Sequence, residues 1–92
     1  MRQFEYMEHI SEYRLYLLET EKSAATIEKY LRDIRKFSDW LGSDRTITKE
    51  RVIEYKHALT AHYKTSSVNS MLVALNMYFH YLGWEECCVR GL

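Results

Sequence analysis

A row of cations in the middle of this 92-residue chain is the feature whose chemistry is easiest to name. Lys29, Arg32 and Lys36 are spaced 3 and 4 residues apart, so a helix would carry them along one side, with Arg35 beside them. Such a row can follow a phosphate backbone, because each cation displaces a condensed counterion. Acidic residues interleave with the row, however, and i,i+4 ion pairs would make it an ordinary solvated helix face. The spacing alone leaves both interpretations open.

A second feature is a long segment without charge. Residues 65–84 contain no Lys, Arg, Asp or Glu, although the chain has 13 bases and 13 acids elsewhere. Five apolar residues spaced 4, 3, 4 and 3 apart form one inner face, namely Val68, Leu72, Leu75, Phe79 and Leu82. The opposite face carries Asn69, Asn76 and His80, and Gly83 ends the pattern. A polar stripe and a glycine end argue against a membrane span and predict an amphipathic helix.

The neutral face of this segment has two possible uses. Asparagine can form paired hydrogen bonds with adenine, and a helix without acids enters a DNA groove without phosphate repulsion. Its start, Lys64 to Ser67, offers backbone N–H groups and hydroxyls suited to a phosphate. An uncharged protein–protein contact would need the same composition.

Composition limits the remaining function classes. The net charge is zero, but residues 22–64 carry +4, between a start of −3 and an end of −1. The adjacent Cys87 and Cys88 exclude a disulfide scaffold and favour a reducing cytoplasm, and the N-terminus does not resemble a signal peptide. Glycine-rich phosphate loops and common hydrolase motifs do not occur. The scattered histidines predict no metal site, and no cofactor is expected.

Four helices must position these residues. Their expected bounds are 4–20, 24–41, 49–62 and 66–82, within one domain covering residues 1–92. Ser23 and Thr48 are expected N-caps, and Gly42 and Gly83 are expected at helix C-termini. The absence of Pro and the presence of only three Gly favour long helices joined by short turns.

Three stretches in this order resemble the N-terminal core-binding, SAM-like domain of tyrosine recombinases and phage-type integrases. They are EKSAATIEKYLRDIRKFSDWL, ITKERVIEYKHAL and SSVNSMLVALNMYFHYL, and the resemblance covers about residues 8–84. It implies an all-α fold, a compact four-helix orthogonal bundle that grips one face of double-stranded DNA. The implied partners are DNA, the protein's own catalytic domain and other recombinase protomers, without a membrane. The family's catalytic tyrosine lies in that separate domain, which this chain is expected to lack, so no enzyme activity is expected.

The resemblance also implies the residues that face DNA. On the second helix they are Thr26, Lys29, Tyr30, Arg32 and Lys36, and on the fourth they are Ser67, Asn69, Ser70, Val73 and Asn76. Lys64 and Thr65, together with Lys22, are expected to contact the DNA backbone at two helix starts. Ser70 and Asn76 stand where the family usually has arginine, which predicts weaker DNA binding. The alternative is a helical module that self-associates without contacting DNA.

Overall fold

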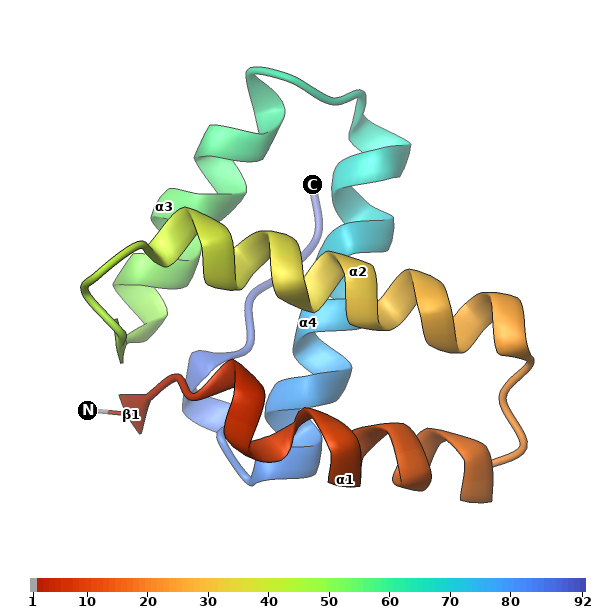
Figure 1. Ribbon diagram of the computed structural model, residues 1–92. Helices are drawn as coiled ribbons and strands as arrows, with labels where there is room; N and C mark the ends of the chain where they lie inside the picture. The colour runs from red at the N-terminus through yellow and green to blue at the C-terminus, as the bar shows by residue number, and fades with distance from the viewer. Residues whose placement is uncertain (1) are drawn as a thin grey trace.

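The computed structural model describes residues 2–92, apart from the side chains of residues 7 and 8. Four helices and a small two-stranded sheet make up the fold (Figure 1). In chain order the elements are β1 (Arg2–Gln3), α1 (Tyr6–Glu19), α2 (Ala24–Leu41), β2 (Thr46–Ile47), α3 (Lys49–Thr60), α4 (Thr65–Leu82) and the 3-10 helix η1 (Glu85–Cys87). The expected all-α, four-helix class is confirmed. No helix in the described part is long and apolar enough to cross a membrane.

Side-chain caps and glycine explain where the helices begin and end. Ser23 accepts a hydrogen bond from the backbone N–H three residues later at 3.1 Å, and Thr48 does the same at 3.2 Å. Gly83 is left-handed with φ 76°, and the next backbone N–H returns to the Phe79 carbonyl at 2.8 Å. This geometry stops α4 because a residue with a Cβ rarely adopts that φ.

Helix α4 lies at the centre of the packing, which explains much of its lack of charge. Its expected inner face is buried, except for Leu82, which is half-buried. A second row, formed by Met71, Ala74 and Tyr78, is buried too and was not predicted. Helix α2 crosses one side of α4, whereas α3 and η1 pack on another (Figure 1). The neutral outer face is therefore narrower than the sequence pattern indicated.

The sheet positions the N-terminus and was not predicted. Strand β1 pairs antiparallel with β2, with Arg2 opposite Ile47. The pairing continues where the backbone N–H of Phe4 donates to the Arg45 carbonyl at 2.8 Å. Phe4 is 1% exposed because this extended segment inserts its ring into the core. Helix α1 therefore begins at Tyr6, two residues after the expected start.

Aromatic rings fill the centre between the helices. The Phe37 ring on α2 meets the edges or faces of Phe4, Tyr55 and Phe79 with centroids 5.3, 4.8 and 6.1 Å apart. All three pairs are T-shaped, an arrangement worth about 0.5–1.5 kcal/mol per pair beyond burial. These contacts hold α2, and the cations on it, in a fixed position relative to α4.

Candidate nucleic-acid interface

Lys29 has a structural role that its spacing does not reveal. Its ammonium pairs with the carboxylate of Asp33 one turn later, and it also donates to the Ser70 carbonyl on α4 at 3.4 Å. Asp33 is 8% exposed and is the only buried charged residue of the described chain. A buried carboxylate needs such a partner, because burying an isolated charge costs several kcal/mol. The i,i+4 pairing considered from the sequence therefore occurs here, at the junction of α2 and α4.

Arg32 and Lys36 belong to the same row but differ from Lys29. Both are exposed, and neither forms an ion pair with any side chain that the structure describes. The Lys36 ammonium donates to the Tyr63 hydroxyl at 2.6 Å and lies 4.9 Å from the centre of that ring. Tyr63 precedes Lys64, the N-cap residue of α4, so this contact turns Lys36 toward the start of α4.

The start of α4 is exposed from Lys64 to Ser66, with Ser67 half-buried. Lys64 is the N-cap residue, and its side chain accepts no capping hydrogen bond. The first turn of a helix carries N–H groups without intrahelical partners and a partial positive charge. Exposed amides, the Lys64 ammonium and the Lys36 ammonium therefore create positive potential around one end of α4.

The two asparagines of the neutral face bind the chain's own C-terminal segment. Asn76 forms two hydrogen bonds with the Val89 backbone, donating to the carbonyl at 2.8 Å and accepting from the N–H at 3.1 Å. Asn69 accepts from the Leu92 N–H at 2.6 Å and donates to its carbonyl at 3.4 Å. Figure 1 shows this segment passing between α3 and α4.

The spacing of these contacts has a simple geometric cause. Seven residues of α-helix rise about 10.5 Å, and three residues of extended chain span about 10 Å. Asn69 and Asn76 therefore match Leu92 and Val89, and the segment lies antiparallel to the helix. Their amide groups are engaged in this arrangement, so contact with a DNA base would require the segment to move.

The other expected site residues surround this region in varied settings. Thr26 is half-buried, and its hydroxyl accepts from that of Ser23 at 2.9 Å within the α2 cap. Tyr30 is partly buried against the core, and Ser70 is also half-buried. Val73 is 51% exposed, and Thr65 is exposed at the first residue of α4. Lys22 is half-buried in the turn before α2.

A basic hollow between α1 and α2 was not predicted. Arg14 of α1 lines it together with Arg32 and Arg35 of α2, and Glu28 is the acidic residue among the lining side chains. The sequence indicated Arg35 beside the basic row but gave no reason to include Arg14. Arg14 lies eighteen residues before Arg32 in the sequence, and the two come together only because α1 packs on α2.

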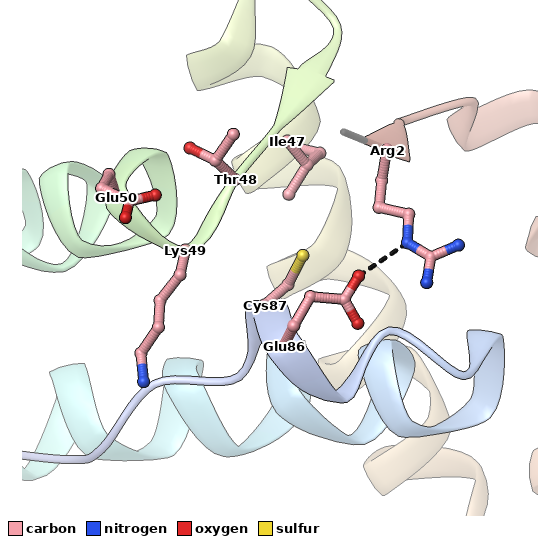
Figure 2. A pocket seen from close by; sticks show the side chains of 7 residues that line it. All are labelled: Arg2, Ile47, Thr48, Lys49, Glu50, Glu86 and Cys87. Carbon is pink, nitrogen blue, oxygen red and sulfur yellow. Dashed lines mark hydrogen bonds and ion pairs between the residues drawn. The ribbon is translucent and has the colours of Figure 1, made fainter.

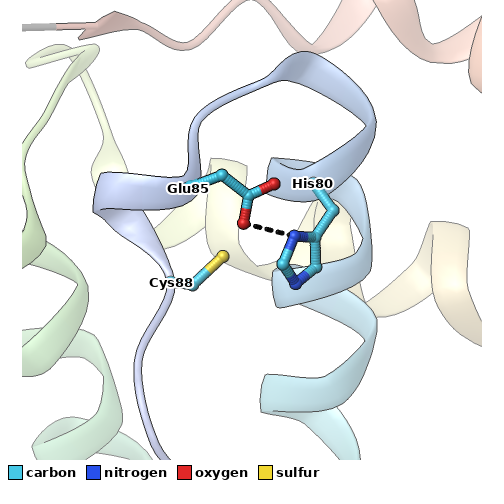
Figure 3. Close-up of side chains that lie close together, drawn as sticks. All are labelled: His80, Glu85 and Cys88. Carbon is cyan, nitrogen blue, oxygen red and sulfur yellow. Dashed lines mark ion pairs between the residues drawn. The ribbon is translucent and has the colours of Figure 1, made fainter.

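Near the C-terminal end of α4, His80, Glu85 and Cys88 lie close together (Figure 3). His80 Nδ1 is 2.5 Å from a Glu85 carboxylate oxygen, and the ligand-type atoms of all three lie within 4.8 Å of one another. Burial and Glu85 raise the pKa of the Cys88 thiol above its ordinary value. The cluster was not predicted from the sequence. His80, Glu85 and Cys88 are spaced 5 and 3 residues apart, across two helical elements and a glycine turn, and no helical repeat brings such positions together.

The neighbouring Cys87 faces another side of the molecule. It is 1% exposed and lines a hollow with Arg2 and Glu86, whose side chains form an ion pair at 2.7 Å (Figure 2). This pair connects the N-terminal strand to η1. The Arg2 guanidinium lowers the pKa of the Glu86 carboxyl, and burial raises the pKa of the Cys87 thiol.

Tyr13, Tyr55 and Tyr78 are buried packing residues. Burial raises the pKa of Tyr13, Tyr55 and Tyr78 well above the ordinary value, which keeps these phenols protonated. The hydroxyls of Tyr13 and Tyr55 are buried, without a hydrogen-bond partner among the described residues. A nucleophilic tyrosine needs access to its substrate and a neighbouring base, which these positions do not provide.

Comparison with known proteins identifies the family. The family model described as "Phage integrase, N-terminal SAM-like domain" matches residues 10–86, most of the chain. No curated protein and no solved structure matches. The matched domain is distinct from the catalytic domain of phage integrases, and its role is DNA binding in integration and recombination by tyrosine recombinases. The recognition made from the three stretches is confirmed: the chain belongs to the phage integrase N-terminal SAM-like domain family.

Proposed function

We propose that this domain holds duplex DNA at a recombination site through the exposed cations of α2 and the N-terminal end of α4. The observation that carries the proposal is the contact between Lys36 and Tyr63. It brings a cation from the middle of α2 to the exposed start of α4, where Lys64 adds a second. A phosphate at this point would receive both charges and the free N–H groups of the first helical turn.

The proposed contact set differs from the basic row, because it omits Lys29 and adds Lys64. Arg32, Lys36 and Lys64 supply its charge, and we name these three the phosphate patch. Lys29 is left out of the test, because its charge already compensates Asp33 inside the fold. Thr65, Ser66 and Ser67 contribute hydroxyls and amides beside the patch.

The face of α4 beyond its first turn contributes shape more than charge. Val73 is exposed and offers a methyl contact, and Ser70 lies next to it on the side toward α2. Asn69 and Asn76 join the contact only when the C-terminal segment leaves them. Binding that rests on three cations and few base contacts is weak, about 10⁻⁴–10⁻⁶ M at physiological salt.

A pair of triple variants tests the proposal. Replacing Arg32, Lys36 and Lys64 by Glu should abolish binding of a fluorescent DNA duplex measured by anisotropy. The control replaces Lys49, Lys56 and Arg90 by Glu, which changes the net charge equally at a hollow lined by α3 and the C-terminal segment. The control should retain more affinity than the test variant. Equal losses would show that net charge alone governs binding, and would contradict the proposed surface.

Self-association without DNA contact is the second candidate function. Leu15 and Leu18 are 60% and 53% exposed and lie three residues apart on α1, so they share a side of that helix. Exposed apolar pairs of this kind favour a protein partner. Sedimentation tests it: a tight dimer that excludes DNA and is broken by Leu15→Glu with Leu18→Glu would support this function over the first.

A further inference from the structure

We propose that His80, Glu85 and Cys88 form a binding site for a thiophilic divalent metal ion of the Zn²⁺ class. They offer an imidazole nitrogen, a carboxylate oxygen and a sulfur, the three donor types that zinc binds in proteins. The donor atoms lie within 4.8 Å of one another, and Figure 3 shows the three side chains pointing toward a common space.

The backbone around the site is held by contacts that do not involve the three side chains. The left-handed Gly83 turns the chain back at the end of α4, and its N–H donates to the His80 carbonyl at 3.1 Å. The Cys88 N–H donates to the Glu85 carbonyl at 3.2 Å. One residue further on, the two hydrogen bonds between Val89 and the Asn76 side chain fix the backbone of Val89. The three Cα positions are therefore set before any ion arrives.

Only side-chain rotation separates this arrangement from a coordinated one. Zinc lies about 2.0–2.3 Å from nitrogen, oxygen and sulfur ligands, so tetrahedral ligands are about 3.2–3.8 Å apart. His80 Nδ1 and the Glu85 oxygen, 2.5 Å apart, must therefore separate by about 0.7 Å to admit an ion between them, and the sulfur must turn toward the same point. The side chains of His80 and Glu85 are 54% and 63% exposed, which leaves a fourth position open to water.

The charge balance also suits a divalent cation. Binding displaces the proton of the Cys88 thiol into solvent as the sulfur–metal bond forms. The resulting thiolate and the Glu85 carboxylate together neutralise the two positive charges of the ion. The C-terminal end of α4, where His80 lies, carries a partial negative charge that favours a cation. A bound ion would clamp the start of the C-terminal segment to the end of α4.

Cobalt(II) is the probe for the test, because a cobalt–thiolate bond gives a charge-transfer absorption band in the near ultraviolet. We expect the reduced protein to bind one Co²⁺ with this band, and Zn²⁺ to displace it. Cys88→Ala should remove the band, and His80→Ala should weaken binding by more than about tenfold. Cys87→Ala is the matched control, because that sulfur faces the hollow of Figure 2 and should leave the band unchanged.

Thermal unfolding supplies a second readout that does not depend on cobalt. Zn²⁺ should raise the Tm of the unaltered protein and of Cys87→Ala, and should not raise that of Cys88→Ala. Three results would overturn the site: no charge-transfer band in the unaltered protein, a band that survives Cys88→Ala, or a band lost in a folded Cys87→Ala variant. Circular dichroism of each variant establishes that it is folded.

Discussion

Replacing Lys29 by Met should destabilise the fold, although Lys29 belongs to a row of otherwise exposed cations. The substitution keeps the aliphatic stem and removes the ammonium that compensates Asp33. Asp33 is 8% exposed, so water cannot fully replace the lost partner. The contact with the Ser70 carbonyl disappears as well, which weakens the junction of α2 and α4.

The magnitude follows from the burial of the two partners. Removing one partner of a fully buried ion pair costs about 3–5 kcal/mol. The Lys29 side chain is 33% exposed, so partial solvation reduces the expected cost to about 2–3 kcal/mol. In a domain of this size that loss lowers the Tm by about 10–20 °C, taking about 4–8 °C per kcal/mol.

Urea unfolding followed by circular dichroism measures the loss, with Lys36→Met as the matched control. Lys36 is exposed and has no described carboxylate partner, so its replacement should change stability by less than about 0.5 kcal/mol. The double variant Lys29→Met with Asp33→Leu should recover most of the loss, since both charges are then gone. If Lys29→Met and Lys36→Met lowered the free energy of unfolding by similar amounts, the structural role of Lys29 would be refuted.

Two further expectations concern the C-terminal segment and the buried tyrosines. Asn76→Ala should lower the free energy of unfolding in urea by about 2 kcal/mol, because it removes two hydrogen bonds from Val89, which is 7% exposed. Asn69→Ala removes the contact with the exposed Leu92 and should lower it by less. The reverse order would contradict the role of Asn76. The second expectation concerns Tyr13, Tyr55 and Tyr78, whose pKa is raised in the folded state. Their burial stabilises the fold only while the phenols are protonated. This contribution is therefore complete below the unfolded-state pKa of about 10, and it falls as the pH rises above that value. Tyrosinate absorbance should show that at least three of the eight tyrosines ionise only as the protein unfolds; ionisation of all eight in the native state near pH 10 would be inconsistent with the burial of Tyr13, Tyr55 and Tyr78.

Local signals made most of the helical framework predictable from the sequence. Ser23, Thr48 and Gly83 act within one helical turn, and each marks a boundary that the structure contains. The β1–β2 pairing was not predictable in the same way. It depends on the burial of Phe4 in a core whose shape is set by residues far along the chain, and two-residue strands leave no periodic pattern.

The candidate site was predictable as a region, whereas the state of its side chains was not. Helical spacing places Lys29, Arg32 and Lys36 on one side, but it does not reveal that Lys29 lies over Asp33 at a helix junction. Likewise, Asn76 and His80 were recognised on the outer face of α4. Their contacts depend on where the chain goes after Gly83, and residue spacing carries no information about that path.

The salt dependence of DNA binding tests the phosphate patch most directly. If Arg32, Lys36 and Lys64 each neutralise one phosphate, log Kobs should fall with log salt concentration with a slope of about −2.7. The Lys49, Lys56 and Arg90 charge-reversal control should keep that slope, and a single Lys36→Met variant should reduce its magnitude by about 0.9. A slope near zero for the unaltered protein, or one that Lys36→Met leaves unchanged, would contradict binding of DNA at this surface.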